Sequence, residues 1–479
     1  MPINSFLYPG ASGPPSSYEV ANSLRFNDDD SPSLTRTQSS SPTHDDKGTL
    51  SFWFKIGNLS SGDGQYFFSV FTDSNNRMQM LLQSDNTLKL VQKTGGSTVI
   101  NLVTNREFRD VSAWYHVVLA CDSSQGTASN RIKIYINGVQ ETSFSTETYC
   151  NQDVDIQLVK GTAVSLGAYN SGASDFFDGY LAEMVLVDGQ QLAQTSFGQF
   201  NEDTPTVWEP IDVTGLTFGT SGFYLDIEDS SALGNNVSGG SDFTANNLQS
   251  LDQCTDTCTN NFCTWNPLIN RQGRTAVTFS EGNLKAQHND TGGNTPSWGT
   301  FLLNSGKWYW EVKITSAGII YCGVWQPGYN DGDVDDALNG IVVYRTDGNK
   351  QAETAATAAS YGNSFTTGDI IGVAVDVDTG TIWFSKNGTW QNSATISEIG
   401  AGTTTNSAYT GKSFATNGIL PAVSAYQQSG NAIIEANFGG GTSFSISSGN
   451  ADANGFGNFE YPVPSGYFSL CSKNLGEHG

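Results

Sequence analysis

Residues 114–140, WYHVVLACDSSQGTASNRIKIYINGVQ, hold the clearest structural signal in the chain. In 131–136 isoleucines alternate with Arg, Lys and Tyr, which is the pattern of a strand with one buried face. The Asn137-Gly138 pair that follows accepts the positive φ angles of a two-residue hairpin turn. Residues 114–120 are mostly apolar and predict a more central strand. The stretch therefore predicts two neighbouring strands of a β-sandwich.

The same period-two alternation recurs on both sides of this stretch, bounded by Gly, Asn, Asp and Ser. Helical spacing is almost absent, with one short candidate at 193–200. This pattern predicts an all-β fold of two antiparallel β-sandwiches. The alternating segments are 50–56, 66–71, 78–84, 87–93, 164–169 and 180–189, and then 306–314, 319–325, 340–348, 368–390, 419–426 and 432–439.

Changes in composition and periodicity along the sequence predict the domain boundaries. A chain of 479 residues is too long for one ordinary core. Residues 198–275 have no sustained period, but their aromatic residues are too frequent for a free coil, so an ordered connector packed on a domain surface is expected. The predicted parts are an arm at 1–20, a first sandwich at 21–197, the connector at 198–275, a second sandwich at 276–471 and a tail at 472–479.

The charge balance argues against two classes of partner. The chain has 22 Lys and Arg against 47 Asp and Glu, a net charge of −25. It has no basic cluster to neutralise phosphates, so neither nucleic acid nor an anionic membrane surface is expected as a partner. No apolar run reaches the length of a membrane-spanning helix, and the N-terminus lacks the features of a signal peptide. Membrane insertion is therefore not expected.

Three segments, GTLSFWFKIG (48–57), 114–140 and SDFFDGYLAEMVLVDGQQL (174–192), resemble the laminin-G-like, concanavalin A-like lectin fold. SGKWYWEVKI (305–314), GDIIGVAVDVDTGTIWFSKNG (368–388) and ILPAVSAYQQSGNAIIEANFG (419–439) resemble a SPRY domain. The resemblance implies a concanavalin A-like jelly roll followed by SPRY. Domains of these kinds serve binding, so a non-enzymatic protein is expected.

Residues 20–37 and 222–256 resemble virion proteins of tailed bacteriophages of the marine type. This resemblance implies a virion component assembled in the host cytoplasm, with other virion proteins as partners and a homo-oligomeric state. The favoured interpretation is a tail fibre or appendage that recognises a host-surface glycan or protein. A capsid or tail decoration protein is the alternative, and a secreted glucan hydrolase is a third possibility from another class.

Catalytic groups are hard to find in this sequence. A retaining glucanase needs two carboxylates about 5–5.5 Å apart, which the related enzymes take from an E-x-D-x-x-E strand. No such run occurs, and the acidic clusters 226–229 and 376–378 have other spacings. His116 sits within a predicted strand and is expected to be a packed or hydrogen-bonded sheet histidine. The sequence therefore predicts no catalytic residue.

Aromatic residues in predicted loops are the candidates for sugar stacking, beside fixed polar groups. They are Trp298, Trp325, Tyr329 and Trp390. Trp325 and Tyr329 flank an acidic loop that carries three further binding candidates, Asp331, Asp333 and Asp335.

Carboxylates at alternate positions of this loop suit calcium, but Asp336 stands where a calcium loop needs glycine and Val342 where it needs glutamate. A solvated acidic loop is the alternative. Asp175 and Asp178 in the first sandwich are a similar calcium possibility. No cofactor is expected otherwise.

The chain has seven cysteines, and an odd number cannot form a complete disulfide framework. Cys254, Cys258 and Cys263 could supply three zinc thiolates, but no fourth ligand is near in the sequence. We therefore expect no metal there, and either one disulfide or free thiols.

Overall fold

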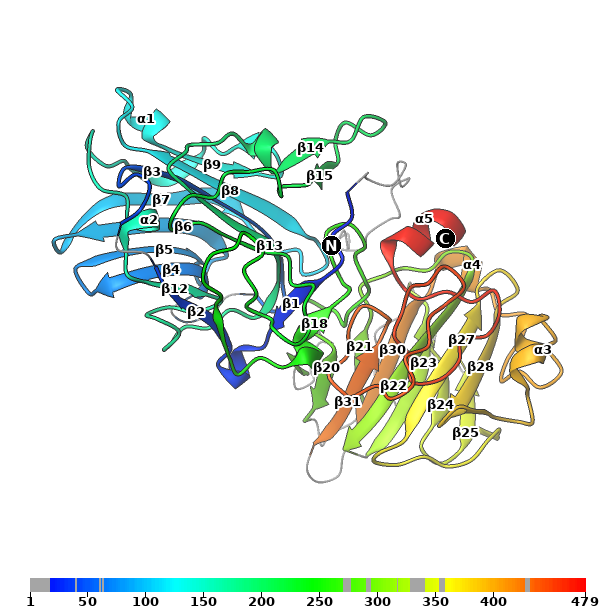
Figure 1. Cartoon of the computed structure of the whole chain (residues 1–479). Coiled ribbons are helices and arrows are strands. Elements are labelled where there is room, and N and C mark those ends of the chain that lie inside the picture. The colour runs from blue at the N-terminus through cyan, green and yellow to red at the C-terminus, as the bar shows by residue number, and fades with distance from the viewer. Residues whose placement is uncertain are drawn as a thin grey trace. The chain divides into compact units, whose positions relative to one another are not determined.

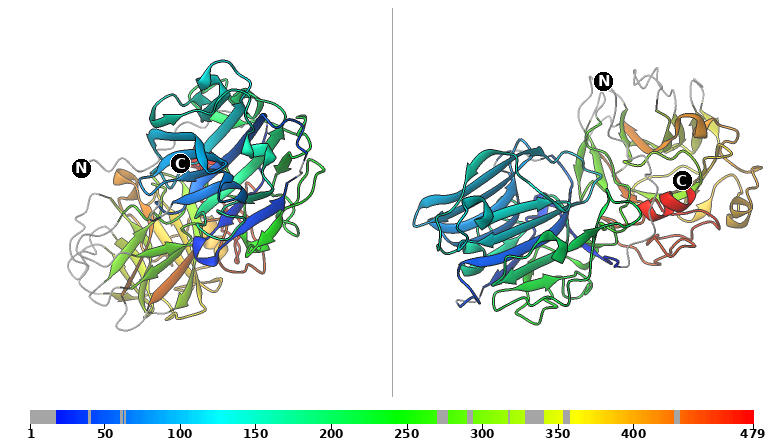
Figure 2. Two further views of the ribbon diagram at one scale, coloured as in Figure 1. Left: turned by 90° about the vertical axis from the view of Figure 1, so that its left-hand side faces the viewer. Right: turned by 90° about the horizontal axis from the view of Figure 1, so that it is seen from above.

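The computed structural model describes residues 18–38, 41–59, 62, 64–269, 277–289, 294–316, 318–327, 341–352, 358–426 and 431–479. The described chain forms two compact units that meet in the sequence between Thr259 and Asn260. Each unit contains two large antiparallel sheets (Figures 1 and 2). The predicted all-β fold of two antiparallel sandwiches is confirmed. We call the units the first domain and the second domain.

The first domain consists of two eight-stranded sheets and a small hairpin. The first sheet has the order β10-β9-β8-β3-β13-β1-β18, and β16 also pairs with β13; the second has the order β11-β7-β6-β5-β4-β12-β2-β17. In sheet order the bounds are β10 Val139–Gln140, β9 Ile132–Ile136, β8 Tyr115–Asp122, β3 Lys47–Ile56, β13 Gly179–Asp188, β1 Ser23–Phe26, β18 Gln253–Cys254 and β16 Phe223–Leu225, then β11 Phe144–Thr148, β7 Ser97–Glu107, β6 Thr87–Thr94, β5 Asn76–Leu82, β4 Gln65–Asp73, β12 Ala163–Leu166, β2 Ser33–Thr37 and β17 Thr244–Asn246, with the hairpin β14 Gly198–Phe200 and β15 Trp208–Pro210.

The stretch 114–140 forms the strand pair that its sequence predicts. Strand β8 pairs antiparallel with β9, and Val118 lies opposite Tyr135. The three isoleucines of β9 are buried while the residues between them are only half-buried, as the alternation requires. Asn137 and Gly138 have φ angles of 46° and 78°, so the predicted hairpin turn is confirmed.

Most of the connector is built into the first domain. It supplies β16, β17 and β18, which pair with β13, β2 and β1, and it also forms the β14–β15 hairpin. These pairings give backbone groups of the connector their hydrogen-bond partners. Each of these strands is only two or three residues long, so the connector shows no continuous alternation of apolar residues. From Asn260 onward the chain belongs to the second domain.

The second domain has a seven-stranded sheet, β19-β20-β31-β22-β27-β28-β29, and a six-stranded sheet, β21-β30-β23-β24-β25-β26. Large side chains such as Trp265, Trp308 and Trp310 are fully buried in its core. The bounds in sheet order are β19 Thr278–Ser280, β20 Lys285–His288, β31 Ala432–Asn437, β22 Lys307–Ser316, β27 Ile370–Asp376, β28 Thr381–Lys386 and β29 Thr389–Trp390, then β21 Thr295–Trp298, β30 Leu420–Tyr426, β23 Ile319–Trp325, β24 Ile341–Arg345, β25 Asn349–Ala352 and β26 Ala359–Ser360.

The described helices are all short, and none is long and apolar enough to cross a membrane. The helix candidate at 193–200 forms only the 3-10 turn η2 before β14 begins, because this segment pairs as a hairpin with β15. Residues 472–478, expected as a tail, form a helix anchored by buried Leu475. The helices are η1 Asp28–Asp30, α1 Ala128–Arg131, α2 Gln157–Lys160, η2 Gln194–Ser196, η3 Ser250–Asp252, α3 Ile396–Gly400, α4 Phe414–Asn417 and α5 Ser472–His478.

Candidate functional site

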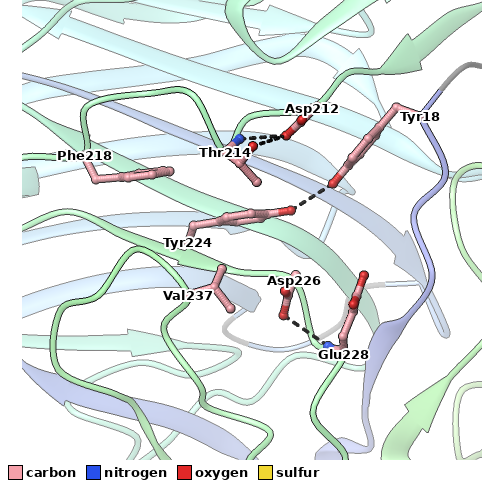
Figure 3. A pocket seen from close by; sticks show the side chains of 8 residues that line it. All are labelled: Tyr18, Asp212, Thr214, Phe218, Tyr224, Asp226, Glu228 and Val237. Carbon is pink, nitrogen blue, oxygen red and sulfur yellow. Dashed lines mark hydrogen bonds between the residues drawn. The ribbon is translucent and has the colours of Figure 1, made fainter.

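The first domain contains a pocket of about 340 Å³, which we call the first-domain pocket. Figure 3 shows its side chains gathered around the ring of Tyr224, with one carboxylate on one side and two on the other. The connector supplies all of the lining residues but one. They are Tyr18, Asp212, Thr214, Phe218, Tyr224, Asp226, Glu228 and Val237.

A β-bulge in β13 brings a carboxylate into hydrogen-bond contact with two tyrosines that line this pocket. The pairing of β13 with β3 shifts register between Ala182 and Val185, and Glu183 adopts a φ of 49°. Leu181 and Met184 both point into the core of the sandwich, whereas strict alternation would have sent Glu183 there with Leu181. The extra residue of the bulge instead turns Glu183 to the outer face, where Tyr18 and Tyr224 meet it.

Glu183 and the two tyrosines form a closed hydrogen-bonded group. Tyr18 Oη donates to Glu183 Oε2 at 3.1 Å, and Tyr224 Oη lies 3.0 Å from the same oxygen. The two hydroxyls are 2.9 Å from each other. Glu183 is only 6% exposed, and burial, as the largest cause, raises the pKa of its carboxyl to about 7. A protonated Glu183 can donate one hydrogen bond, so each of the three groups can both donate and accept.

The aromatic wall of the pocket is a stacked pair. The rings of Phe218 and Tyr224 have centroids 6.1 Å apart and lie within 11° of parallel (Figure 3). Tyr224 is buried and Phe218 is half-buried, while Val237, on the other side of the Tyr224 ring in Figure 3, is 42% exposed. Phe218 and Val237 therefore supply the apolar surface that a ligand could contact.

Carboxylates form the polar rim. Asp212 accepts hydrogen bonds from the backbone N and Oγ1 of Thr214 at 2.8 and 2.7 Å, and these bonds hold the pKa of Asp212 below its usual value. Asp226 accepts a bond from the backbone N of Glu228 at 3.1 Å (Figure 3). No Lys, Arg or His is among the lining residues. The rim therefore accepts hydrogen bonds from hydroxyl or amino groups and repels anionic ligands.

The Glu183 group predicts an unusual pH dependence of stability. In the folded chain Glu183 keeps its proton up to about pH 7, whereas unfolded glutamate releases it near 4.5, so Glu183 lowers the free energy of unfolding as the pH rises through this window. Buried His116 acts in the opposite direction, because desolvation lowers its pKa from 6.5 to about 3. Below pH 6.5 the unfolded chain binds a proton at this histidine and the folded chain does not, so the free energy of unfolding falls as the pH falls. Between pH 4.5 and 6.5 the two slopes, each about 1.4 kcal/mol per pH unit, cancel.

We therefore expect Glu183→Gln to expose the His116 slope. The free energy of unfolding of the first domain should change little between pH 4.5 and 6.5 in the parent protein, and should rise by about 1.4 kcal/mol per pH unit in the variant. Urea unfolding at a series of pH values measures both. Equal slopes in the two proteins would contradict the prediction. Glu209→Gln, at a half-buried connector residue outside the pocket, is the control and should retain the parental slope.

The structure places the predicted binding aromatics differently from the sequence analysis. Trp298 and Trp390 were expected in loops, but they lie in β21 and β29 and are 5% and 8% exposed. Trp325 ends β23 half-buried, with its ring 5.1 Å from that of Trp298. The loop assignment is therefore wrong for these three residues, because strand pairing draws them into the sheets. The other candidates, Tyr329, Asp331, Asp333 and Asp335, lie outside the described residues.

The cysteine set and the Asp175 and Asp178 pair are not brought together into a metal site in the described part of the chain. Among the residues that the structure describes, no group of three or more His, Cys, Asp or Glu side chains could hold a metal ion. Asp178 accepts a hydrogen bond from Asn58, and Asp175 accepts one from Ser174. All seven cysteines lie in the described residues as thiols, so of the two expected alternatives thiols, and not a disulfide, apply to Cys254, Cys258 and Cys263.

Sequence reasoning did not select Glu183, Tyr18 or Tyr224 for the site. The only local signal is a single charged residue in the otherwise apolar run YLAEMVLV (180–187). A bulge does not show in the residue pattern, so the outward turn of this carboxylate could be found only in the structure.

Two family models match the chain. Residues 28–194 match the concanavalin A-like lectin/glucanases superfamily (laminin G type), and residues 307–441 match the SPRY domain. The chain therefore carries a lectin-like domain followed by a SPRY domain, as the sequence resemblance implied. Both are binding-type folds, and no enzyme family is indicated.

Several solved structures are similar to parts of the chain. The SPRY domain of human HERC1 is 18% identical, with 38% of this chain and 99% of that chain covered and a TM-score of 0.28. A heptameric SAP-like pentraxin from Limulus polyphemus is 19% identical, with 37% and 80% covered and a TM-score of 0.26. Domain 4 of AbnA, an extracellular arabinanase from Geobacillus stearothermophilus in complex with arabinotriose, is 17% identical, with 31% and 63% covered and a TM-score of 0.22.

Proposed function

We propose that this protein is a non-catalytic glycan-binding protein, and that the first-domain pocket holds an uncharged sugar residue. The observation that carries the proposal is the combination of a half-buried aromatic ring, Phe218, with a carboxylate rim in a pocket of about 340 Å³ that the connector builds outside the lectin-matched residues 28–194. Small-ligand sites are typically concave, with apolar walls and a few placed polar groups.

The chemistry of the rim narrows the class of sugar. Asp212, Asp226 and Glu228 can accept hydrogen bonds from sugar hydroxyls, while Phe218 packs against the apolar face of the ring. Sialic acids, uronic acids and sulfated sugars carry negative charges that these carboxylates repel. We therefore expect neutral glycans to bind in preference to acidic ones.

The carboxylates also support binding over hydrolysis. Glu183 comes from β13, and the rim carboxylates come from the connector, so no strand presents an alternating acidic triplet to one face. The hydrogen bonds of Glu183 go to two tyrosines that line the pocket. This arrangement suits a fixed polar group rather than a free general acid.

Replacing Phe218 by alanine is expected to weaken glycan binding about tenfold, because the variant loses one stacking surface. The full chain is applied to an array of neutral, sialylated and sulfated glycans, and the affinities of the bound glycans are then measured by calorimetry. Phe200→Ala, which removes a 42% exposed ring outside the pocket, is the matched control and should bind as the parent does. Selective binding of acidic glycans, or an unaltered affinity of Phe218→Ala, would contradict the proposal.

We further propose that the protein is a homo-oligomeric component of a phage virion, in a tail fibre or appendage that recognises the host surface. The support is the resemblance of residues 20–37 and 222–256 to tailed-phage virion proteins, together with two binding-type domains in one chain. Cryo-electron microscopy of intact particles tests it. Copies projecting from the tail support host recognition, copies lying flat on the capsid support the decoration alternative, and absence of the chain from particles would refute both.

A further inference from the structure

The second domain contains its own pocket, of about 380 Å³, which shares no lining residue with the first-domain pocket. We call it the second-domain pocket. Its lining includes Tyr309, Ser385, Trp390 and Tyr461. It includes one residue that the sequence analysis selected for binding, Trp390.

Two lining residues, Ser385 and Trp390, belong to a row of facing residues across four strands. Glu311 of β22 pairs with Gly372 of β27, Gly372 with Ser385 of β28, and Ser385 with Trp390 of β29. Facing residues of paired strands point to the same face of a sheet. A Cβ atom at Gly372 would lie 2.4 Å from Ser385 Oγ and 3.0 Å from Tyr309 Oη, so the glycine leaves the space that the two hydroxyls occupy.

The hydroxyl of Ser385 is the unusual group in this row. Ser385 is 1% exposed, and its Oγ makes no hydrogen bond within the described structure. The neighbouring hydroxyl of Tyr309, by contrast, donates to Glu311 Oε1 at 2.9 Å. A buried hydroxyl without a partner is unfavourable unless a ligand or water supplies the missing bond.

The wall of the pocket is held in place by Glu311. The backbone N atoms of Glu460 and Tyr461 donate to its carboxylate at 2.9 and 2.8 Å. This fixes Tyr461 against Gly388, where a Cβ atom would lie 2.5 Å from the Tyr461 ring. The segment that carries Tyr461 lies beyond residues 307–441, which match the SPRY model.

The lining chemistry selects the class of ligand. No charged side chain lines the pocket, so neither phosphates nor ammonium groups find a counter-charge there. A serine hydroxyl both donates and accepts, as a sugar hydroxyl does. The aromatic side chains of Trp390 and Tyr461 supply an apolar wall, and the volume suits a compact small ligand. We propose that the second-domain pocket binds a neutral saccharide, with one sugar hydroxyl paired to Ser385 Oγ.

The test uses the full-length Phe218→Ala protein, in which binding by the first-domain pocket is weakened, and every comparison is made within this background. It is titrated with lactose, cellobiose, maltose and diacetylchitobiose, and binding is followed by saturation-transfer NMR and by tryptophan fluorescence. At least one disaccharide is expected to bind, and adding Ser385→Ala should weaken it about tenfold. The same change should leave the melting temperature of the unliganded second domain equal or higher, because it removes an unpaired buried hydroxyl.

Ser424→Ala is the matched control. Ser424 lies in β30, and its Oγ is likewise buried without a hydrogen bond in the described structure, but it is not in the pocket lining. This change should leave binding unaltered. The proposal is overturned if no disaccharide binds, if Ser385→Ala binds as tightly as its parent, or if a tetraproline peptide binds there in place of the sugars. Because each Ser385→Ala and Ser424→Ala protein is compared with its own Phe218→Ala parent, any residual first-domain binding is common to both, and a failure of the first-domain proposal is read separately from the Phe218→Ala comparison with the parent protein.

Discussion

Replacing Asp256 by alanine is expected to lower the free energy of unfolding of the first domain by about 3–5 kcal/mol. Asp256 Oδ2 lies 2.8 Å from Lys55 Nζ, and the two side chains are 4% and 1% exposed. The other carboxylate oxygen accepts a hydrogen bond from Trp114 Nε1 at 3.0 Å. The variant leaves an ammonium group buried opposite an alanine, and it also loses the contact that fastens the end of the connector to β3.

Calorimetry of the full chain measures this effect, because the transition of the second domain serves as an internal reference. Asp203→Ala removes an exposed connector carboxylate and should change the stability by less than about 0.5 kcal/mol. Combining Asp256→Ala with Lys55→Met should recover much of the loss, since no buried charge then remains in this pair. A loss below about 1 kcal/mol for Asp256→Ala alone would mean that water reaches Lys55.

Replacing Trp208 by alanine is the second change with a large expected effect, also about 3–5 kcal/mol in the first domain. The indole lies in a slot between two glycines: Cβ atoms at Gly138 and Gly198 would come within 2.1 and 2.6 Å of its ring. Its Nε1 donates to His116 Nδ1 at 2.9 Å. Because Nδ1 accepts this bond, the proton of neutral His116 is on Nε2, which lies 2.8 Å from Ser51 Oγ.

Two further variants separate packing from hydrogen bonding at Trp208. Trp208→Phe keeps much of the packed ring but loses the bond to His116, so it should cost about 1–3 kcal/mol. Val207→Ala shortens a 48% exposed side chain next to it and should be close to neutral. Urea unfolding of the three variants measures how much each lowers the free energy of unfolding. An equal loss for Trp208→Phe and Trp208→Ala would show that the hydrogen bond, and not the packing, stabilises this contact.

The hydrophobic patterns of the sequence predicted the sandwich strands well. Alternation at Ile132, Ile134 and Ile136 and the Asn137-Gly138 turn are local properties, and the structure confirms both. The expectation that His116 is a hydrogen-bonded sheet residue is also confirmed. Such strands can be predicted from the sequence because a half-buried strand requires apolar and polar residues to alternate with a period of two.

The connector shows where the local pattern stops being informative. Its strands are two or three residues long, too short for a period to appear, so their partners β13, β2 and β1 could not be predicted. Aromatic content indicated only that the segment is packed. The position of Trp298 was predicted wrongly for a related reason, since a polar neighbourhood in sequence does not reveal that a residue pairs with a distant strand. Trp390 pairs locally with Ser385, in a strand of only two residues.

The all-β class, the lectin-like and SPRY resemblances and the excess of negative charge follow from the order of residues along the chain. The two pockets arise only when the sheets are assembled. The first depends on a one-residue bulge that turns Glu183 outward to tyrosines from distant segments, and the second depends on the register that aligns Gly372 with Ser385. The residue types along one strand reveal neither a bulge nor the distant segments that pack against it, because both depend on the packing of whole sheets.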